Sequence, residues 1–143
     1  MELKLNDVTL RFQRMLTLTA NDGFNADGPI VRYGDYDKEV GKMLGGVYLI
    51  VQDGEVVYCG KFTGTFAKRW LYTKGEYVYH FKRGLISMAL NENRTLEVFA
   101  QDVTGLREQL GHPGNEWISA TSIEEKLIND LQPAWNSLGM KKK

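Results

Sequence analysis

The sequence predicts an α+β fold in which helices flank a small central antiparallel sheet. Two short segments rich in β-branched and aromatic residues stand on either side of a turn signal. Helical patterns follow, and one further strand-like segment interrupts them. The resulting order is strand, strand, helix, helix, strand, helix, which favours an α+β sandwich around a small sheet.

Length and composition describe one ordinary globular domain. The chain has 143 residues, of which 43% are hydrophobic and 25% charged. Its single cysteine, Cys59, excludes an intramolecular disulfide and favours a reducing compartment. No apolar run approaches the roughly 20 residues that span a bilayer, and no signal peptide opens the chain. We therefore expect a soluble, cytoplasmic protein with no membrane partner.

The N-terminal residues 1–44 are expected to extend the same domain with strands and a loop. Residues 3–19 alternate weakly between apolar and polar positions, which predicts one or two strands. Residues 20–29 are dense in Asn, Asp and Gly and predict a loop. A short helix over 35–44 is one interpretation of an ambiguous stretch.

The segment 45–137 carries the clearer patterns, and 138–143 form a basic tail that is expected to fray. Strands are expected over 47–51 and 55–59, with a hairpin turn at 52–54. Further elements are expected as helices over 64–74, 79–92 and 116–132, a strand over 95–103 and a turn of helix near 105–110.

The hairpin turn decides whether Tyr48 and Tyr58 share a face of the sheet. A two-residue Asp-Gly turn would place them on opposite faces, because side chains alternate along a strand. A three-residue loop with Gly54 in the left-handed conformation would pair Val51 with Glu55 and set the phenols opposite each other. The sequence fits both turns. We predict the second; a cross-strand aromatic pair that only stabilises the sheet is the alternative to a functional role.

A basic segment follows the hairpin. Residues 61–83 contain six basic residues and one acidic residue, so this segment carries +5 while the rest of the chain carries −5. Such a segment suits localised phosphate contacts, and a solvated helix face is the alternative interpretation. Gly60 precedes it, and glycine at a strand position permits close approach of a ligand or another backbone.

Glu124 is the candidate carboxylate. In the helix expected over 116–132, steps of three, four and seven from Glu124 reach Leu or Ile, whereas Glu125 projects toward a more polar face. A carboxylate within an apolar stripe is costly unless it is paired or bound to a metal. Alternatively, Thr121 caps the helix and Glu124 reaches back to its backbone N–H in a capping box. The sequence leaves both roles open.

Together these residues resemble the motifs of the GIY-YIG nuclease family. The tyrosines of the two tripeptides lie ten residues apart along the hairpin, and a twelve-residue spacing joins Glu124 to Asn136. The resemblance covers about residues 45–137, which is essentially the family's catalytic module. The matching residues are Gly46-Val47-Tyr48, Tyr58-Cys59-Gly60-Lys61, Arg69, Glu124, Leu127, Ile128, Leu131, Pro133, Trp135 and Asn136.

This resemblance implies a nuclease that hydrolyses phosphodiester bonds with one divalent cation, Mg²⁺ or Mn²⁺. Glu124 would hold the metal, and Arg69 would clamp the scissile phosphate. Tyr48 and Tyr58 would bind and activate the attacking water, with Lys61 assisting, and the choice of general base between them stays open. Asn136 would hydrogen-bond within the site.

The chain departs from the family pattern at a few positions. Cys59 replaces an aliphatic residue, and Arg69 falls one residue late after Gly60. Some members carry a His or Tyr about one helical turn after the arginine. Tyr72 is that candidate here, and His80 is a second one, for which a helix-surface histidine is the default interpretation.

The implied partner is nucleic acid, and we expect double-stranded DNA. The expected contacts outside the reaction centre are Lys68, Lys74, Lys82 and Arg83. Cleavage of RNA by the same site and a non-catalytic nucleic-acid-binding module are the alternatives. Cleavage of both strands by one small site usually needs two copies acting together, so a homo-oligomer is compatible with this function. Residues 1–44 could form added strands, an oligomer interface or a DNA-contacting arm.

Overall fold

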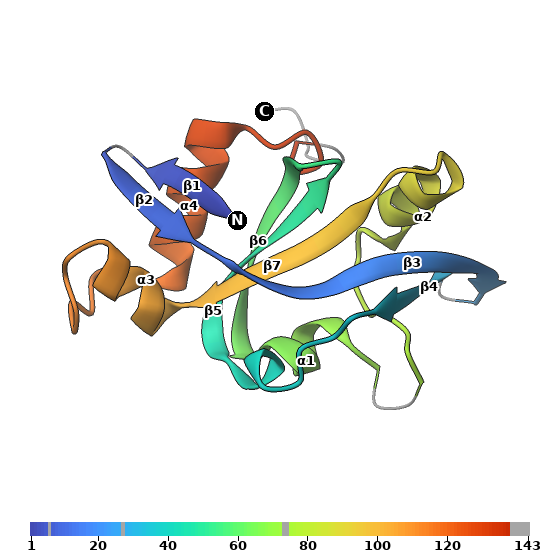
Figure 1. Ribbon diagram of the computed structural model, residues 1–143, viewed down its shortest axis with the longest axis horizontal. Helices are drawn as coiled ribbons and strands as arrows, with labels where there is room; N and C mark the ends of the chain where they lie inside the picture. Colours follow the sequence, from blue (N-terminus) through green and yellow to red (C-terminus); the bar gives the residue numbers. More distant parts are fainter. Residues whose placement is uncertain (6, 27, 73–74, 138–143) are drawn as a thin grey trace.

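A computed structural model describes residues 1–5, 7–26, 28–72 and 75–137, which form an α+β structure around a five-stranded sheet (Figure 1). The strand order is β4-β3-β7-β5-β6, and every neighbouring pair is antiparallel. The strands are β3 (Gln13–Asn25), β4 (Gly28–Gly34), β5 (Leu44–Gln52), β6 (Glu55–Thr65) and β7 (Leu96–Asp102). A separate hairpin pairs β1 (Glu2–Leu5) with β2 (Val8–Arg11). The predicted α+β class with an antiparallel sheet is confirmed.

The N-terminal extension supplies strands to the same sheet as the segment 45–137. β3 pairs with β7 on one side and with β4 on the other. The loop predicted over 20–29 is wrong, since β3 continues to Asn25 and β4 begins at Gly28. The turn-forming residues lie at irregularities inside the β3–β4 ladder, where the Asn21 side chain accepts a hydrogen bond from the Gly23 N–H at 3.0 Å. Strand pairing therefore accommodates residues that locally favour turns.

The described helices are shorter than predicted. They are α1 (Phe66–Trp70), α2 (Arg83–Asn91), α3 (Val103–Gln109) and α4 (Ala120–Leu131), with a 3-10 turn η1 at Val40–Lys42. The helix predicted over 64–74 ends early because Leu71 forms an isolated bridge with Val78. The helix predicted from residue 79 begins only at Arg83. Tyr77 and Val78 pair with β4, and a turn in which the His80 carbonyl accepts the Arg83 N–H precedes the helix.

The start of α4 rules out a capping role for Thr121. Ser119 is the N-cap, its hydroxyl accepts from the Ser122 N–H at 3.1 Å, and the Ser122 hydroxyl accepts from the Ser119 N–H at 2.9 Å. This reciprocal pair satisfies the first backbone donors of the helix. Glu124 lies beyond the cap and is left for another role.

The β5–β6 hairpin differs from the prediction in its turn, although both tyrosines lie on one face. Asp53 and Gly54 both have positive φ, at 49° and 87°, and form a two-residue turn that pairs Gln52 with Glu55. A bulge then shifts the register, because Val51 pairs with Val56 whereas Ile50 pairs with Tyr58. The extra residue, at position 57, turns the following side chain onto the face of Tyr48. The predicted three-residue loop is therefore wrong, and the bulge has the effect on side-chain orientation that the loop was predicted to have.

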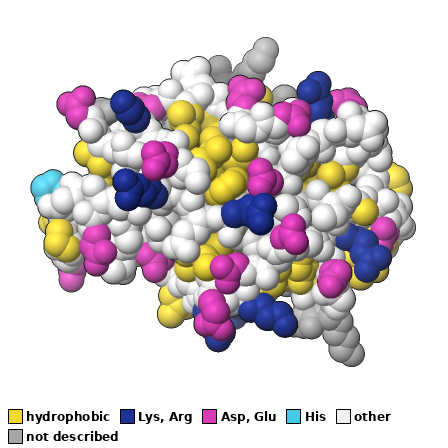
Figure 2. All heavy atoms as spheres, in the orientation of Figure 1, with side chains coloured by type: hydrophobic (Ala, Val, Ile, Leu, Met, Phe, Trp, Pro, Cys, Tyr) yellow, Lys and Arg dark blue, Asp and Glu magenta, His cyan; other side chains and the backbone are white. Residues whose placement is uncertain are grey.

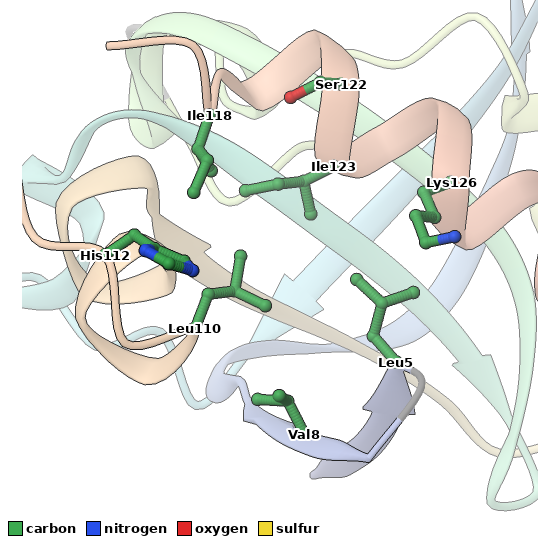
Figure 3. A pocket seen from close by; sticks show the side chains of 8 residues that line it. All are labelled: Leu5, Val8, Leu110, His112, Ile118, Ser122, Ile123 and Lys126. Carbon is green, nitrogen blue, oxygen red and sulfur yellow. The ribbon is translucent and has the colours of Figure 1, made fainter. Parts of the chain in front are cut away.

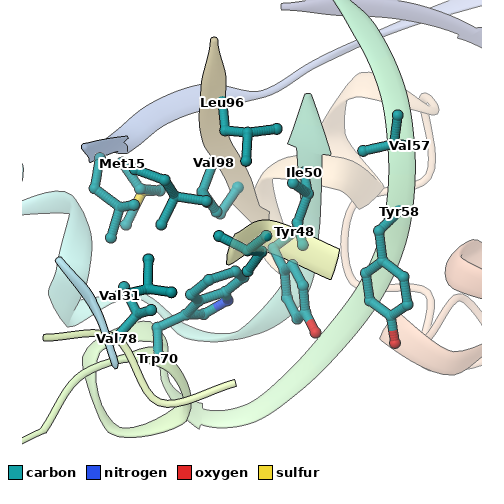
Figure 4. Close-up of a cluster of buried hydrophobic side chains, with 14 of the residues drawn as sticks. Met15, Val31, Tyr48, Ile50, Val57, Tyr58, Trp70, Val78, Leu96 and Val98 are labelled. Carbon is teal, nitrogen blue, oxygen red and sulfur yellow. The ribbon is translucent and has the colours of Figure 1, made fainter. Parts of the chain in front are cut away.

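Helices cover both faces of the hairpin. Tyr48 and Ile50 of β5 belong to one buried cluster with Trp70 of α1 (Figure 4). The same cluster contains Ile86 and Ala89 of α2. Val47 and Leu49 point the other way, into a cluster with α3 and α4. This alternation follows from the two-residue period of a strand. Within the described ranges no helix has the length and apolarity needed to cross a membrane.

Candidate active site

A hollow of about 350 Å³ lies beside the edge strand β6. It collects side chains from β5, β6, α1 and α4, so segments far apart in sequence meet there. The lining residues are Tyr48, Tyr58, Gly60, Lys61, Phe62, Thr63, Arg69 and Glu124. Five of the six residues predicted to be catalytic are among them; Asn136 is not.

Tyr48 and Tyr58 lie side by side, and their hydroxyls point to the same side (Figure 4). Their ring centroids are 6.0 Å apart with an interplanar angle of 29°. Tyr48 crosses the backbone of β6 at Gly60, where an added Cβ would lie 2.4 Å from the phenol oxygen. Only glycine leaves room for the phenol at this position.

His80 is the buried partner of Tyr48. Its side chain is almost fully buried, and Nε2 lies 2.6 Å from the Tyr48 hydroxyl oxygen. Its Nδ1 accepts the backbone N–H of Lys82 at 3.0 Å. A neutral imidazole has one N–H, so its proton is on Nε2, which donates to the Tyr48 oxygen. The default interpretation of a helix-surface histidine is therefore wrong.

The imidazole stays neutral over the physiological pH range. Burial lowers the pKa of His80 to about 3, and the positive charges of Arg69, Lys82 and Arg83 act in the same direction. Its ring is stacked on Trp70 with centroids 4.4 Å apart. Residues 78–81 alternate between buried and exposed positions, but the exposed positions are Tyr79 and Phe81, so the sequence carries no apolar–polar pattern that identifies His80 as buried.

The two phenols differ electrostatically. Burial raises the pKa of Tyr48 strongly, and burial also raises the pKa of Tyr58. Interaction with Tyr58 raises the pKa of Tyr48 further, whereas interaction with Tyr48 lowers that of Tyr58. The hydrogen bond from His80 Nε2–H occupies the Tyr48 oxygen. Tyr58 is the less buried of the two phenols, so its oxygen is the better placed to accept a proton in the hollow.

Arg69 brings positive charge to the phenols. Its guanidinium carbon lies 6.0 Å from the ring centroid of Tyr48 and 5.7 Å from that of Phe81. Its charge lowers the pKa of both tyrosines against the effect of burial. Among the described residues it forms no hydrogen bond or ion pair, so its planar fork of donors is available to an anion.

Glu124 faces the hollow from α4. Burial raises the pKa of its carboxyl, and the nearby Lys61 ammonium lowers it. Lys61 donates its own hydrogen bond to the Thr121 hydroxyl at 2.8 Å. Within the described part of the chain the Glu124 carboxylate has neither a hydrogen-bond donor nor an ion-pair partner. A half-buried carboxylate without a partner is a suitable ligand for a cation.

Asn136 supports the site from behind. Its side-chain oxygen accepts the Cys59 N–H and its side-chain nitrogen donates to the Cys59 carbonyl, both at 2.8 Å. The Trp135 N–H donates to the carbonyl of Val57 at the bulge, again at 2.8 Å. These bonds satisfy the free edge of β6 on either side of Tyr58. The prediction that Asn136 acts within the pocket is corrected to a positioning role.

The remaining predicted residues have different positions. Tyr72 lies after α1 and accepts a hydrogen bond from Arg83 at 3.0 Å. Neither side chain lines the hollow of the tyrosines. Arg83 is largely buried, which corrects its predicted role as a surface contact. Lys68 lines an adjoining hollow that shares Thr63 and Arg69 with the candidate site. The ammonium of Lys82 lies 5.8 Å from the Tyr58 ring centroid. Lys74 lies outside the described residues.

Carboxylates do not cluster into a multi-ligand metal centre. The described residues contain no group of three or more His, Cys, Asp or Glu side chains arranged to hold a metal. Mg²⁺ commonly uses one or two carboxylates and completes its shell with water and substrate phosphate. Glu124 alone can serve such an ion, and the arrangement suits a cation that arrives with the substrate.

A second hollow differs in chemistry. It is lined mainly by apolar side chains of the β1–β2 hairpin, of the segment between α3 and α4, and of α4 (Figure 3). The Ser122 hydroxyl at its edge is occupied in capping α4. On the face drawn in Figure 2, acidic and basic side chains are interspersed and form no single-sign patch. The tyrosine hollow, with its converging titratable groups, is the better candidate for chemistry.

Comparison of the chain with protein-family models, curated proteins and solved structures finds no match. Functional inference therefore depends on the site itself. The features that it can use are the paired phenols, the buried imidazole, the Arg69 guanidinium beside the phenols and the half-buried Glu124 carboxylate.

Proposed function

We propose that this protein is a metal-dependent endonuclease of the GIY-YIG type, which hydrolyses phosphodiester bonds in DNA. The observation that supports this most strongly is the convergence of Tyr48, Tyr58, Arg69 and Glu124 on one open hollow. These residue types supply a proton acceptor, an anion clamp and a cation ligand. Phosphoryl transfer needs positioning and charge stabilisation more than covalent chemistry by the protein, and this set provides both.

Arg69 is the group that would hold the scissile phosphate. Its guanidinium is anchored over the Tyr48 ring, with its donors unoccupied among the described residues. A guanidinium can bind two phosphate oxygens at once and thereby fixes their orientation. Lys68 in the adjoining hollow would contact the next phosphate along the strand.

Tyr58 is the group that would take the proton from the attacking water. The Tyr48 oxygen is occupied by the hydrogen bond from His80 Nε2–H, and interaction with Tyr48 lowers the pKa of Tyr58. Arg69 acts in the same direction, whereas the Glu124 carboxylate raises the pKa of Tyr58. A divalent cation held by Glu124 would neutralise that carboxylate and the charge that develops on the phosphate.

Cleavage of supercoiled plasmid and labelled DNA and RNA oligonucleotides, with Mg²⁺ or Mn²⁺, tests the proposal. The wild type is expected to cleave DNA, and Glu124→Ala to lose roughly 100-fold or more in rate. Glu125→Ala is the matched control, because its side chain is the exposed neighbour on the same helix, and it should keep wild-type activity.

Three results would contradict the proposal. They are no cleavage of any substrate with either metal, equal rates for Glu124→Ala and wild type, and cleavage confined to the RNA oligonucleotides. The last result would keep the nuclease and change its substrate.

A further inference from the structure

Four aromatic rings form a stack that runs from the core to the rim of the candidate active site. Phe66 is stacked on Trp70 at 5.9 Å, Trp70 on His80 at 4.4 Å, and His80 on Phe81 at 4.7 Å, with interplanar angles of 19°, 18° and 23°. The first three side chains are buried, whereas Phe81 is 65% exposed. The stack therefore ends in solvent with a ring that the core holds in a fixed orientation.

The exposed ring lies next to the groups that would handle the phosphate. Its centroid is 5.8 Å from that of Tyr58, a residue that lines the hollow. The Arg69 guanidinium carbon is 5.7 Å from the Phe81 centroid, and the Lys82 ammonium is 5.5 Å from it. An aromatic surface and two cations thus lie within one nucleotide's reach of the tyrosines, and they match the aromatic base and the anionic phosphate of a nucleotide.

We infer that Phe81 is a stacking platform for an unpaired nucleobase beside the cleaved phosphate. This inference rests on the proposed nuclease function and specifies its substrate class as nucleic acid that is single-stranded at the point of cleavage. Bases inside a duplex are stacked on their neighbours, so their faces are not accessible to a protein ring. An unpaired base offers its face, and stacking on it is tolerant of base identity.

Binding without divalent metal separates this inference from catalysis. Fluorescence anisotropy measures the affinity for a labelled single strand and for the same sequence fully paired. It also measures the affinity for a series of single strands, each with one abasic site at a different position of the oligonucleotide. Phe81→Leu keeps an apolar side chain but removes the π-face, whereas Phe81→Tyr keeps the aromatic ring. Phe24→Leu is the matched control, because Phe24 is a 75% exposed phenylalanine on β3.

The wild type should bind the single strand more tightly than the duplex. Phe81→Leu should weaken single-strand binding by about 5- to 150-fold, and Phe81→Tyr and Phe24→Leu should not. An abasic site at one position should weaken wild-type binding to a similar extent. On that strand, Phe81→Leu should cause no further loss of affinity. Equal single-strand affinities of wild type and Phe81→Leu, or the same loss at every abasic position, would overturn the inference.

The two hypotheses fail in different ways. Plasmid cleavage by a wild type whose binding ignores Phe81 would leave the nuclease and remove the platform. A base-dependent effect of Phe81→Leu without cleavage by the wild type would leave the platform and remove the nuclease. Preferential binding of fully paired DNA, unaffected by Phe81→Leu, would overturn the platform.

Discussion

At the scale of single residues, His80 joins the hydrophobic core to the polar side of the hollow. It stacks between Trp70 and Phe81, and its two nitrogens bond to the Lys82 backbone and the Tyr48 hydroxyl. Both polar atoms are thus satisfied inside the protein, which is the condition for burying an imidazole at low cost. The consequence is a neutral donor for which the Tyr48 hydroxyl oxygen is the acceptor.

Burial of neutral His80 should make the fold sensitive to acid. The pKa of His80 is about 3 in the folded protein, against an ordinary value of 6.5. Below pH 6.5 the unfolded chain takes up a proton that the folded chain refuses, so this stabilisation is lost as the pH falls toward 3. The loss should amount to about 2 kcal/mol between pH 7 and pH 5. Urea unfolding at a series of pH values measures it.

The variant His80→Gln isolates this contribution, because glutamine keeps an N–H donor and does not titrate. Its free energy of unfolding should fall less than that of the wild type over the same pH range. His112→Gln, at the exposed second histidine of the chain, should follow the wild-type curve. Parallel curves for wild type and His80→Gln would show that His80 is not buried in the neutral form.

Gly60 is a second residue whose identity the site requires. In Gly60→Ala the new Cβ would overlap the Tyr48 ring at 2.4 Å, so the phenol or the strand has to move. We expect a loss of about 1–3 kcal/mol of stability from overpacking, and a fall in cleavage of roughly 100-fold from misplacement of the phenol. Gly64→Ala, on the same strand, should retain both stability and activity, because its Cβ would make only an ordinary contact with the Lys68 side chain at 3.9 Å; thermal unfolding and plasmid cleavage measure the two.

At the scale of elements, the segment after α4 completes the edge of the sheet. β6 has one strand partner, β5, and its other side is bonded by Trp135 and Asn136. The two bonds to Cys59 imitate the exchange between paired strands. An unpaired edge is open to pairing with another chain, so this segment also protects β6.

Removal of the Asn136 side chain should loosen that edge. Asn136→Ala loses two hydrogen bonds and should lower the free energy of unfolding by about 1–3 kcal/mol. The Cys59 amide should exchange hydrogen faster, which amide exchange followed by NMR detects. Asn129→Ala, at an exposed position of α4, should change stability by no more than about 0.5 kcal/mol. Unaltered exchange at Cys59 would contradict the positioning role.

The sequence predicted the elements that carry local patterns. The hairpin strands, the strand now seen as β7 and the helix bearing Glu124 each show a clear period, and the structure contains all of them. The bulge at Val57 was not predicted, because it depends on a distant part of the chain. The Val57 carbonyl accepts its hydrogen bond from the Trp135 N–H. Likewise, α1 was predicted too long because the bridge between Leu71 and Val78 is a tertiary contact that helix propensity does not include.

At the scale of the whole molecule, zero net charge limits how the protein can hold nucleic acid. The basic segment is balanced by acidic residues elsewhere, and Figure 2 shows both signs interspersed on one face. Nonspecific attraction should therefore be weak, and affinity should come from a few contacts around the hollow. Besides Lys61, whose ammonium donates to Thr121, the exposed or half-buried cations around the hollow are Lys68, Arg69 and Lys82.

Salt titration tests this expectation. If three cations each neutralise one phosphate, the slope of log K against log salt concentration should be about −2 to −3. Lys68→Ala should make the slope shallower by about one, whereas Lys126→Ala, on the exposed side of α4, should not change it. Anisotropy between 50 and 200 mM salt, roughly the range over which such slopes are resolved, gives the values. A slope near −8 or steeper would indicate a broad binding surface instead.

Because of the bulge in β6, the site depends on whether the number of residues between the hairpin turn and Tyr58 is odd or even. Deletion of Val57, or insertion of one residue between Val57 and Tyr58, would carry the phenol to the opposite face, away from Tyr48. Residues added at the Asp53-Gly54 tip would leave every pair below it in place. Length variation that preserves the site is thus confined to the hairpin tip, and an indel lower in β6 would separate the two phenols while leaving the composition of the chain almost unchanged.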